Sequence, residues 1–223
     1  MSWLTRLRTG SDESPAGKLS AVLGDEACWL AAMTGAPVAV HPDRVRSARN
    51  LLQQAPEVDV LVLDDGLQSP VRCDVDILLF DPERDPQGRV ALREPVSSVH
   101  GALMVGLGQD LHKRAGPLRD LETGQRVQAP AEPLVLIAGV GDPASVTRTA
   151  AESGVHIARQ VRVRDHGRPS GRALAQLEAP MLVTEKDAVG WAHATGRPGF
   201  VLQLLLDGVE PLVDEVERRL GDR

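Results

Sequence analysis

Apolar residues in this chain gather in short runs, many rich in Val and Leu, that are separated by stretches with helical spacing of apolar positions. Runs of this length and composition are typical of parallel strands that are buried on both faces. We expect strands over 38–40, 58–63, 75–80, 102–105, 133–138, 155–161, 181–183 and 200–206. We expect helices over 27–33, 42–53, 144–153, 170–177 and 209–220. The alternation predicts an α/β fold with a mostly parallel sheet and helices on both of its faces.

The spacing of these elements also predicts how the chain is divided. Residues 1–23 have no regular pattern and form an irregular N-terminal segment. Residues 109–131 are rich in charge, Gly and Pro, and we expect a loop that joins two lobes. The predicted division is therefore an α/β core over 24–131 and a smaller C-terminal α/β lobe over 132–223.

One apolar run of strand length in the N-terminal half ends abruptly in two carboxylates. Val58–Leu63 is followed directly by Asp64, Asp65 and Gly66. Ligands of open α/β sheets bind beyond the carboxyl ends of the strands, and an Asp at such a strand end helps to hold magnesium in P-loop NTPases. The pattern therefore favours a magnesium-nucleotide site at Asp64 and Asp65.

Three further polar clusters stand at predicted strand ends or helix starts, namely Asp25-Glu26, Asp165-His166 and Thr184-Glu185-Lys186-Asp187. In a parallel sheet such ends share one edge, so the clusters are expected to converge. An Asp beside a His is suited to proton transfer. Simpler interpretations stay open, because acids favour the first turn of a helix without any catalytic role and a loop His is often only a solvated surface group.

Two glycine-containing stretches resemble phosphate loops without matching the pattern. Six residues separate Gly10 from Gly17, and Leu19 follows Lys18, whereas a P-loop needs four residues between the glycines and Ser or Thr after the lysine. Gly139-Val140-Gly141 is better explained as a tight turn from a strand into a helix.

Composition narrows the class of protein. The formal net charge is −6, which does not favour nucleic acid as a partner. Cys28 and Cys73 are isolated, which fits a reducing compartment. The sequence has no apolar run long enough for a transmembrane helix and no signal peptide, so we expect a cytoplasmic protein. Residues 2–8 form either a frayed terminus or an amphipathic basic turn that rests on a membrane face.

A set of motifs in fixed order resembles the tetraacyldisaccharide 4′-kinase (lipid A 4′-kinase) family. The shared motifs are Gly24-Asp25-Glu26, Gly35-Ala36-Pro37-Val38 with Pro42-Asp43-Arg44, Asp64-Asp65-Gly66-Leu67-Gln68, Leu92-Arg93-Glu94-Pro95, Ala138-Gly139-Val140-Gly141-Asp142-Pro143, Asp165-His166 and Thr184-Glu185-Lys186-Asp187-Ala188-Val189. The resemblance runs from residue 22 to the C-terminus.

The resemblance implies a P-loop-NTPase-like kinase of lipid A biosynthesis. Such an enzyme moves the γ-phosphoryl group of ATP, with Mg²⁺, to the 4′-hydroxyl of a lipid disaccharide, the lipid A precursor. It works at the cytoplasmic face of the inner membrane as a peripheral protein. Carried over to this sequence, Asp25 is the catalytic base, paired with His166. Glu26 supports the metal or the base, and Asp64 and Asp65 form the magnesium-side acidic motif that binds the cofactor.

The sequence departs from the family pattern in its phosphate-binding parts. The Walker A loop and the strands that accompany it upstream of Gly24 are missing, and Ser69 stands where the family usually has His. Three interpretations therefore stay open: an active kinase homologue whose phosphate-binding parts come from elsewhere, a catalytically inactive pseudokinase or binding module, and a fragment of a longer kinase.

Overall fold

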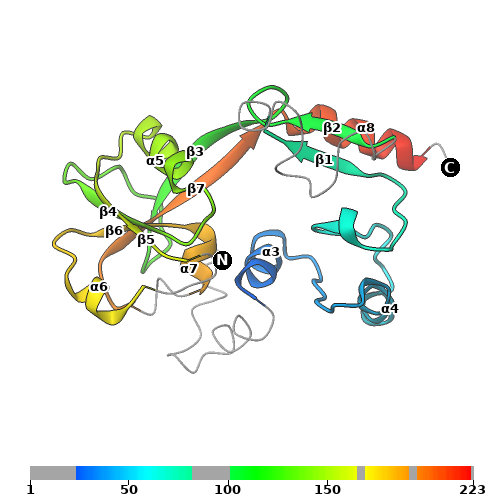
Figure 1. Ribbon diagram of the computed structural model, residues 1–223, viewed down its shortest axis with the longest axis horizontal. Helices are drawn as coiled ribbons and strands as arrows, with labels where there is room; N and C mark the ends of the chain where they lie inside the picture. Colours follow the sequence, from blue (N-terminus) through cyan, green and yellow to red (C-terminus); the bar gives the residue numbers. More distant parts are fainter. Residues whose placement is uncertain (1–23, 82–100, 165–168, 191–194, 222–223) are drawn as a thin grey trace. The chain divides into compact units, whose positions relative to one another are not determined.

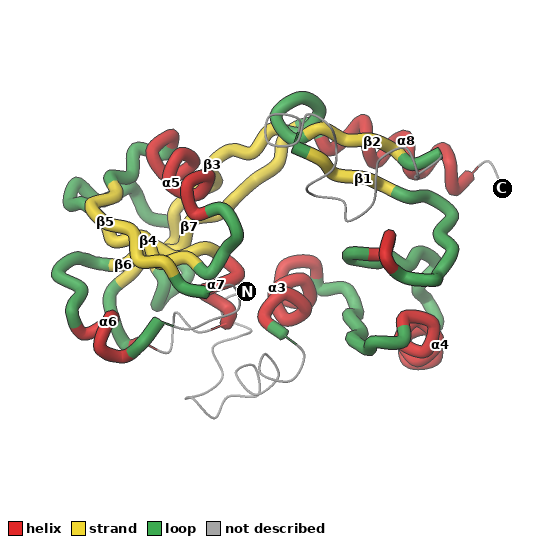
Figure 2. Tube along the Cα trace, viewed as in Figure 1, coloured by secondary structure: helices red, strands yellow, loops and turns green. Residues whose placement is uncertain are grey.

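The computed structural model describes residues 24–81, 101–164, 169–190 and 195–221. Figures 1 and 2 show these residues as ribbon and tube.

The chain forms two compact units. Unit 1 comprises Met1–Asp59 and Ala115–Leu204. Unit 2 comprises Val60–Arg114 and Leu205–Arg223. Each unit is therefore built from segments that are distant in the sequence.

The elements alternate along most of the chain as expected for an α/β protein. The helices are α3 (Asp25–Thr34), α4 (Arg44–Gln54), α5 (Pro143–Glu152), α6 (Gly171–Ala175), α7 (Glu185–Gly190) and α8 (Val209–Gly221), with a short 3-10 helix η1 (Gly66–Gln68). The strands are β1 (Ile77–Phe80), β2 (Leu103–Gly106), β3 (His112–Asp120), β4 (Leu134–Ala138), β5 (Ile157–Arg162), β6 (Met181–Thr184) and β7 (Gly199–Asp207).

The larger sheet has five strands in the order β3-β7-β6-β4-β5. The pairs β4·β5, β4·β6 and β6·β7 are parallel. Leu136 of β4 packs on one face with Val146 of α5, and Ile137 packs on the other with Leu174 of α6 and Ala188 of α7. Figure 1 shows α5 and α6 on opposite sides of this sheet. The prediction of a mostly parallel sheet with helices on both faces is confirmed.

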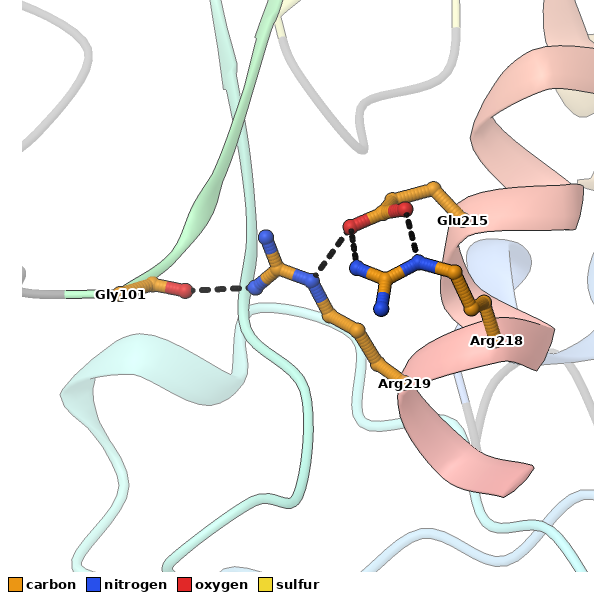
Figure 3. A network of polar contacts seen from close by, with 4 residues as sticks. All are labelled: Gly101, Glu215, Arg218 and Arg219. Atoms are coloured by element: carbon orange, nitrogen blue, oxygen red, sulfur yellow. Dashed lines mark hydrogen bonds and ion pairs between the residues drawn. The ribbon is translucent and has the colours of Figure 1, made fainter. Parts of the chain in front are cut away.

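The smaller sheet consists of β1 and β2, which pair in parallel with Leu78 opposite Met104. Leu78 and Val105 are buried, at 4% and 5% exposure. The C-terminal helix α8 contacts the segment that leads into β2, because Arg219 donates a hydrogen bond to the carbonyl oxygen of Gly101, two residues before β2, at 2.7 Å. Glu215 accepts hydrogen bonds from both Arg218 and Arg219 in the same network (Figure 3).

Two predicted strands are not present. Residues 38–40 and 58–63 are assigned to no strand, and Val62 is 90% exposed. The segment 58–63 has the composition of a buried strand, but strand preference depends on a neighbouring strand and on burial. None of the described strands pairs with it. The prediction of a strand that ends at Asp64 is therefore wrong.

The predicted loop over 109–131 is also wrong in part, since it contains β3. This strand carries Lys113, Arg114 and Pro117 and lies at an edge of the five-stranded sheet. Charged residues and Pro are characteristic of edge strands, which need not look hydrophobic. The sequence pattern therefore concealed a strand that has a neighbour on only one side.

Candidate active site

Helix α3 begins at Asp25, the predicted base, with Glu26 next to it in the first turn. Gly24 before it has φ 89°, a left-handed region conformation that Gly adopts without strain. Gly35 closes the helix in the left-handed conformation, and its N–H donates to the carbonyl oxygen of Ala31. Acidic residues at a helix N-terminus are stabilised by the helix dipole. The sequence thus places two carboxylates at the start of a ten-residue helix in unit 1.

The Thr184-Glu185-Lys186-Asp187 turn lies at the carboxyl end of β6 and begins α7. Helix α3 packs against α7. The ammonium of Lys186 lies 3.6 Å from a carboxylate oxygen of Glu26, with side-chain exposures of 18% and 53%. Two of the predicted polar clusters, Asp25-Glu26 and Thr184–Asp187, are therefore brought together within unit 1.

The carboxylates on either side of Lys186 are buried and hydrogen-bonded. Asp187 accepts from the hydroxyl of Thr184 at 2.8 Å and from the N–H of Gly139 at 3.3 Å. Glu185 accepts from the amide of Gln203 at 2.8 Å. Burial raises the pKa of both carboxyl groups, and these hydrogen bonds partly offset the rise. These buried hydrogen bonds connect the end of β6 with Gly139, which follows β4, and with Gln203 of β7.

The Asp64-Asp65 pair belongs to unit 2 and occupies a turn before η1. Both residues are exposed. Asp65 has φ 50° and ψ 42°, a left-handed conformation that is uncommon outside Gly and that Asp tolerates better than most residues. A side chain on Gly66 would meet the Cβ of Leu63 at 3.0 Å, so the turn favours Gly there.

The carboxylates of Asp64 and Asp65 are suited to binding Mg²⁺ in the way that kinases bind it. Mg²⁺ is held by one or two carboxylates, with waters and substrate phosphates completing its shell. Two exposed, adjacent carboxylates in Asp64 and Asp65 suit that arrangement. Within the described residues, no group of three or more His, Cys, Asp or Glu side chains could hold a metal on protein ligands alone.

The structure does not test the predicted pairing of the base with His166. His166, the predicted partner of the base, lies outside the described residues. Arg162 and Arg164, near it in sequence, are exposed at the carboxyl end of β5. Sequence reasoning missed the ion pair of Lys186 with Glu26 and the contact of Glu185 with Gln203, because both join different elements of the fold.

Among the helices that the structure describes, none is both long and apolar enough to cross a membrane.

Comparison with known proteins supports the resemblance seen in the motifs. The family model described as tetraacyldisaccharide-1-P 4′-kinase (LpxK) matches residues 8–207. A tetraacyldisaccharide 4′-kinase of Shewanella woodyi is 33% identical over 188 residues, which is 75% of this chain and 53% of the relative. A protein of the same name from Bordetella petrii is 32% identical over 216 residues, which is 82% of this chain and 59% of the relative. The chain thus spans a little more than half the length of these curated relatives.

A solved structure shows the same fold. The crystal structure of the "apo" form of LpxK from Aquifex aeolicus in complex with ATP superposes with a TM-score of 0.61 at 18% identity. The match covers 88% of this chain and 69% of that one. With a family model that matches most of its residues, this chain belongs to the tetraacyldisaccharide-1-P 4′-kinase family.

Proposed function

We propose that this chain takes part in ATP-dependent phosphoryl transfer to the 4′-hydroxyl of a lipid disaccharide, the reaction after which its family is named. The observation that carries the proposal is the placement of α3. The helix that begins with Asp25 and Glu26 packs against the polar turn at the carboxyl edge of a parallel sheet, where α/β proteins bind their ligands.

Each residue has a definite role in this proposal. Asp25, assisted by His166, accepts the proton of the 4′-hydroxyl as its oxygen attacks the γ-phosphorus of ATP. The bond from the γ-phosphorus to the bridging oxygen breaks, and ADP leaves with the electron pair. Asp64 and Asp65 would hold Mg²⁺, and Glu26 would support the metal or the base. Bound Mg²⁺ neutralises charge on the transferred group and on the leaving oxygen.

The proposed site also needs groups that cradle the β- and γ-phosphates. The 223 residues contain no GxxxxGK[ST] motif, which supplies those groups in P-loop kinases. The proposal therefore requires a further polypeptide segment that carries this loop. We propose that the complete site works on lipid at the cytoplasmic face of the inner membrane, with this chain bound peripherally.

A reconstituted transfer assay tests the proposal. Labelled ATP and the tetraacyldisaccharide 1-phosphate are incubated with the purified chain, alone and with a segment of a relative that carries the Walker A motif. We expect transfer only in the mixture, and we expect Asp25→Asn to abolish it while Lys113→Met, an exposed substitution on β3, leaves it unchanged. If the mixture transfers no phosphoryl group while the intact relative does, the proposal is wrong.

A second candidate function is a non-catalytic binding module. It is favoured by the missing Walker A motif and by Ser69 at the position where the family pattern has His. This candidate predicts no change in melting temperature of the chain with Mg-ATP. A rise of several degrees that Asp65→Ala removes would exclude it, because that substitution deletes a magnesium-side carboxylate.

A further inference from the structure

We infer that Lys186 is a positioning residue, which holds the helix that begins with Asp25 through its ion pair with Glu26. The inference rests on the proposed function, because it assigns Lys186 a part in that reaction. Lys186 is one of only three lysines in the sequence and lies in the Thr184–Asp187 cluster, to which the proposed reaction assigns no step.

The first argument is that hydrogen bonds fix the backbone on both sides of Lys186. Thr184 caps α7, and the N–H of Asp187 donates to the Thr184 hydroxyl at 3.3 Å while that hydroxyl donates to Asp187 at 2.8 Å. Asp187 also accepts from the backbone N–H of Thr184, so the two residues form the reciprocal pattern of a capping box. Asp187 also accepts from the N–H of Gly139, which joins the turn to the end of β4.

The second argument is that the turn is also fixed to β7. Glu185, only 5% exposed, accepts a hydrogen bond from the side chain of Gln203 and another from the backbone N–H of Leu204. A buried carboxylate is costly unless it is hydrogen-bonded. Because both neighbours of Lys186 are bound to different strands, the turn cannot rotate without breaking buried polar contacts.

The third argument concerns the direction in which the side chain of Lys186 extends. It is the one residue of α7 that is not buried, and its side chain reaches Glu26. A lysine can bury its aliphatic stem and still present its ammonium at the end. The rigid turn therefore projects a cation to the first turn of α3.

Helix α3 needs such a contact. It has ten residues, and isolated helices of that length are marginal in water. Its N-cap is Gly24, which supplies no side-chain hydrogen bond. The first turn, which carries Asp25 and Glu26, is therefore the part of the helix that an external contact stabilises most. A misplaced general base lowers the rate steeply, since proton transfer needs hydrogen-bond geometry.

Hydrogen exchange on the full chain tests the positioning role without any need for catalysis. In Lys186→Met, which keeps the length of the stem and removes the charge, amides of residues 28–34 should exchange about two- to fivefold faster, the range set by a partly exposed ion pair. Amides of α5 should not change. Lys186→Arg should restore protection, and Lys113→Met should leave α3 as in the wild type. Unchanged exchange of α3 in Lys186→Met would overturn the inference.

A double-substitution cycle identifies the partner. Glu26→Gln should accelerate exchange of α3 as Lys186→Met does, and the two together should add little, because they remove the same contact. Additive effects would contradict the assignment. In the reconstituted transfer assay, Lys186→Met should lower kcat more than it raises KM for ATP. If that assay shows no transfer with wild-type chain, the proposed function fails while the exchange result still decides whether Lys186 holds α3.

Discussion

At the scale of single residues, the buried carboxyl of Asp187 should make stability depend on pH. Burial raises its pKa above the usual 3.8, so the folded state binds its proton more tightly than the unfolded state does. Its contribution to stability is therefore fully present below pH 3.8 and is lost as the pH rises through the raised pKa. Asp187→Asn lacks this titration. We expect the free energy of unfolding of the wild type minus that of the variant to fall as the pH rises.

Urea unfolding across a pH series measures that difference, and carboxyl groups elsewhere cancel in the subtraction. Asp43→Asn is a suitable control, because Asp43 is an exposed helix cap at the start of α4. A difference for Asp187→Asn that grows with pH would show that the folded state prefers the charged carboxylate, against the effect of burial.

Gly208, just before α8, is a second residue with a predictable role. It has φ +88°, and a Cβ there would collide with the backbone carbonyl oxygen of Asp110. Gly154 has φ +77° but open space around it. Gly154→Ala should cost only the strain of the left-handed conformation, about 1–2 kcal/mol. Gly208→Ala should cost about 1–3 kcal/mol more because backbone must move. If both variants lose the same free energy of unfolding in urea, the predicted collision with the carbonyl oxygen of Asp110 does not occur.

At the scale of elements, the run 58–63, which is exposed over 59–62, and the buried strand β6 have similar composition and should respond differently to mutation. Val62 is 90% exposed and Val183 is 0% exposed. Val62→Ala should change the free energy of unfolding by less than about 0.5 kcal/mol. Val183→Ala should cost about 1.5 kcal/mol or more, because it removes buried methyl groups and leaves a cavity. A large loss for Val62→Ala would mean that this segment is covered by another part of the protein.

The same contrast shows what the sequence can predict about elements. The predictions of β4 and β6 were correct, since their apolar runs do enter a sheet. The helix expected over 42–53 is α4, and the side chain of Asp43 caps it by accepting from the N–H of Arg46. The run over 58–63 failed because composition does not reveal whether a neighbouring strand exists. Strand β3 was missed because an edge strand has little hydrophobic pattern.

The candidate site was predictable to the same extent. Polar clusters were predicted at strand ends at both Asp64-Asp65 and Thr184–Asp187. Thr184 does end β6 and Glu185 begins α7, whereas Asp64 and Asp65 follow a segment that forms no strand. The ion pair of Lys186 with Glu26 joins positions 160 residues apart. No local pattern contains that information, because it depends on how α3 packs against α7.

At the scale of the whole molecule, the two units differ in how well they bury apolar side chains. Of the described residues in unit 2, Leu78, Val105 and Leu111 are buried hydrophobics, whereas unit 1 contains most of the core. Unit 2 also leaves large apolar side chains exposed, among them Ile77 and Leu79 of β1, at 45% and 50%. Since burial of apolar surface is the main source of stability, unit 2 should open more readily than unit 1.

Native-state hydrogen exchange measures this difference. The slowest amides should lie in β4 and β6, whose side chains are almost completely buried, and amides of β1 and β2 should exchange at least about tenfold faster. Low concentrations of urea should accelerate β1 and β2 before they affect β4. The chain would then unfold in more than one step, so each free energy of unfolding and each melting temperature given above refers to the unit that contains the substituted residue. Equal protection of β1 and β4 at every urea concentration would show instead that the two units unfold as one.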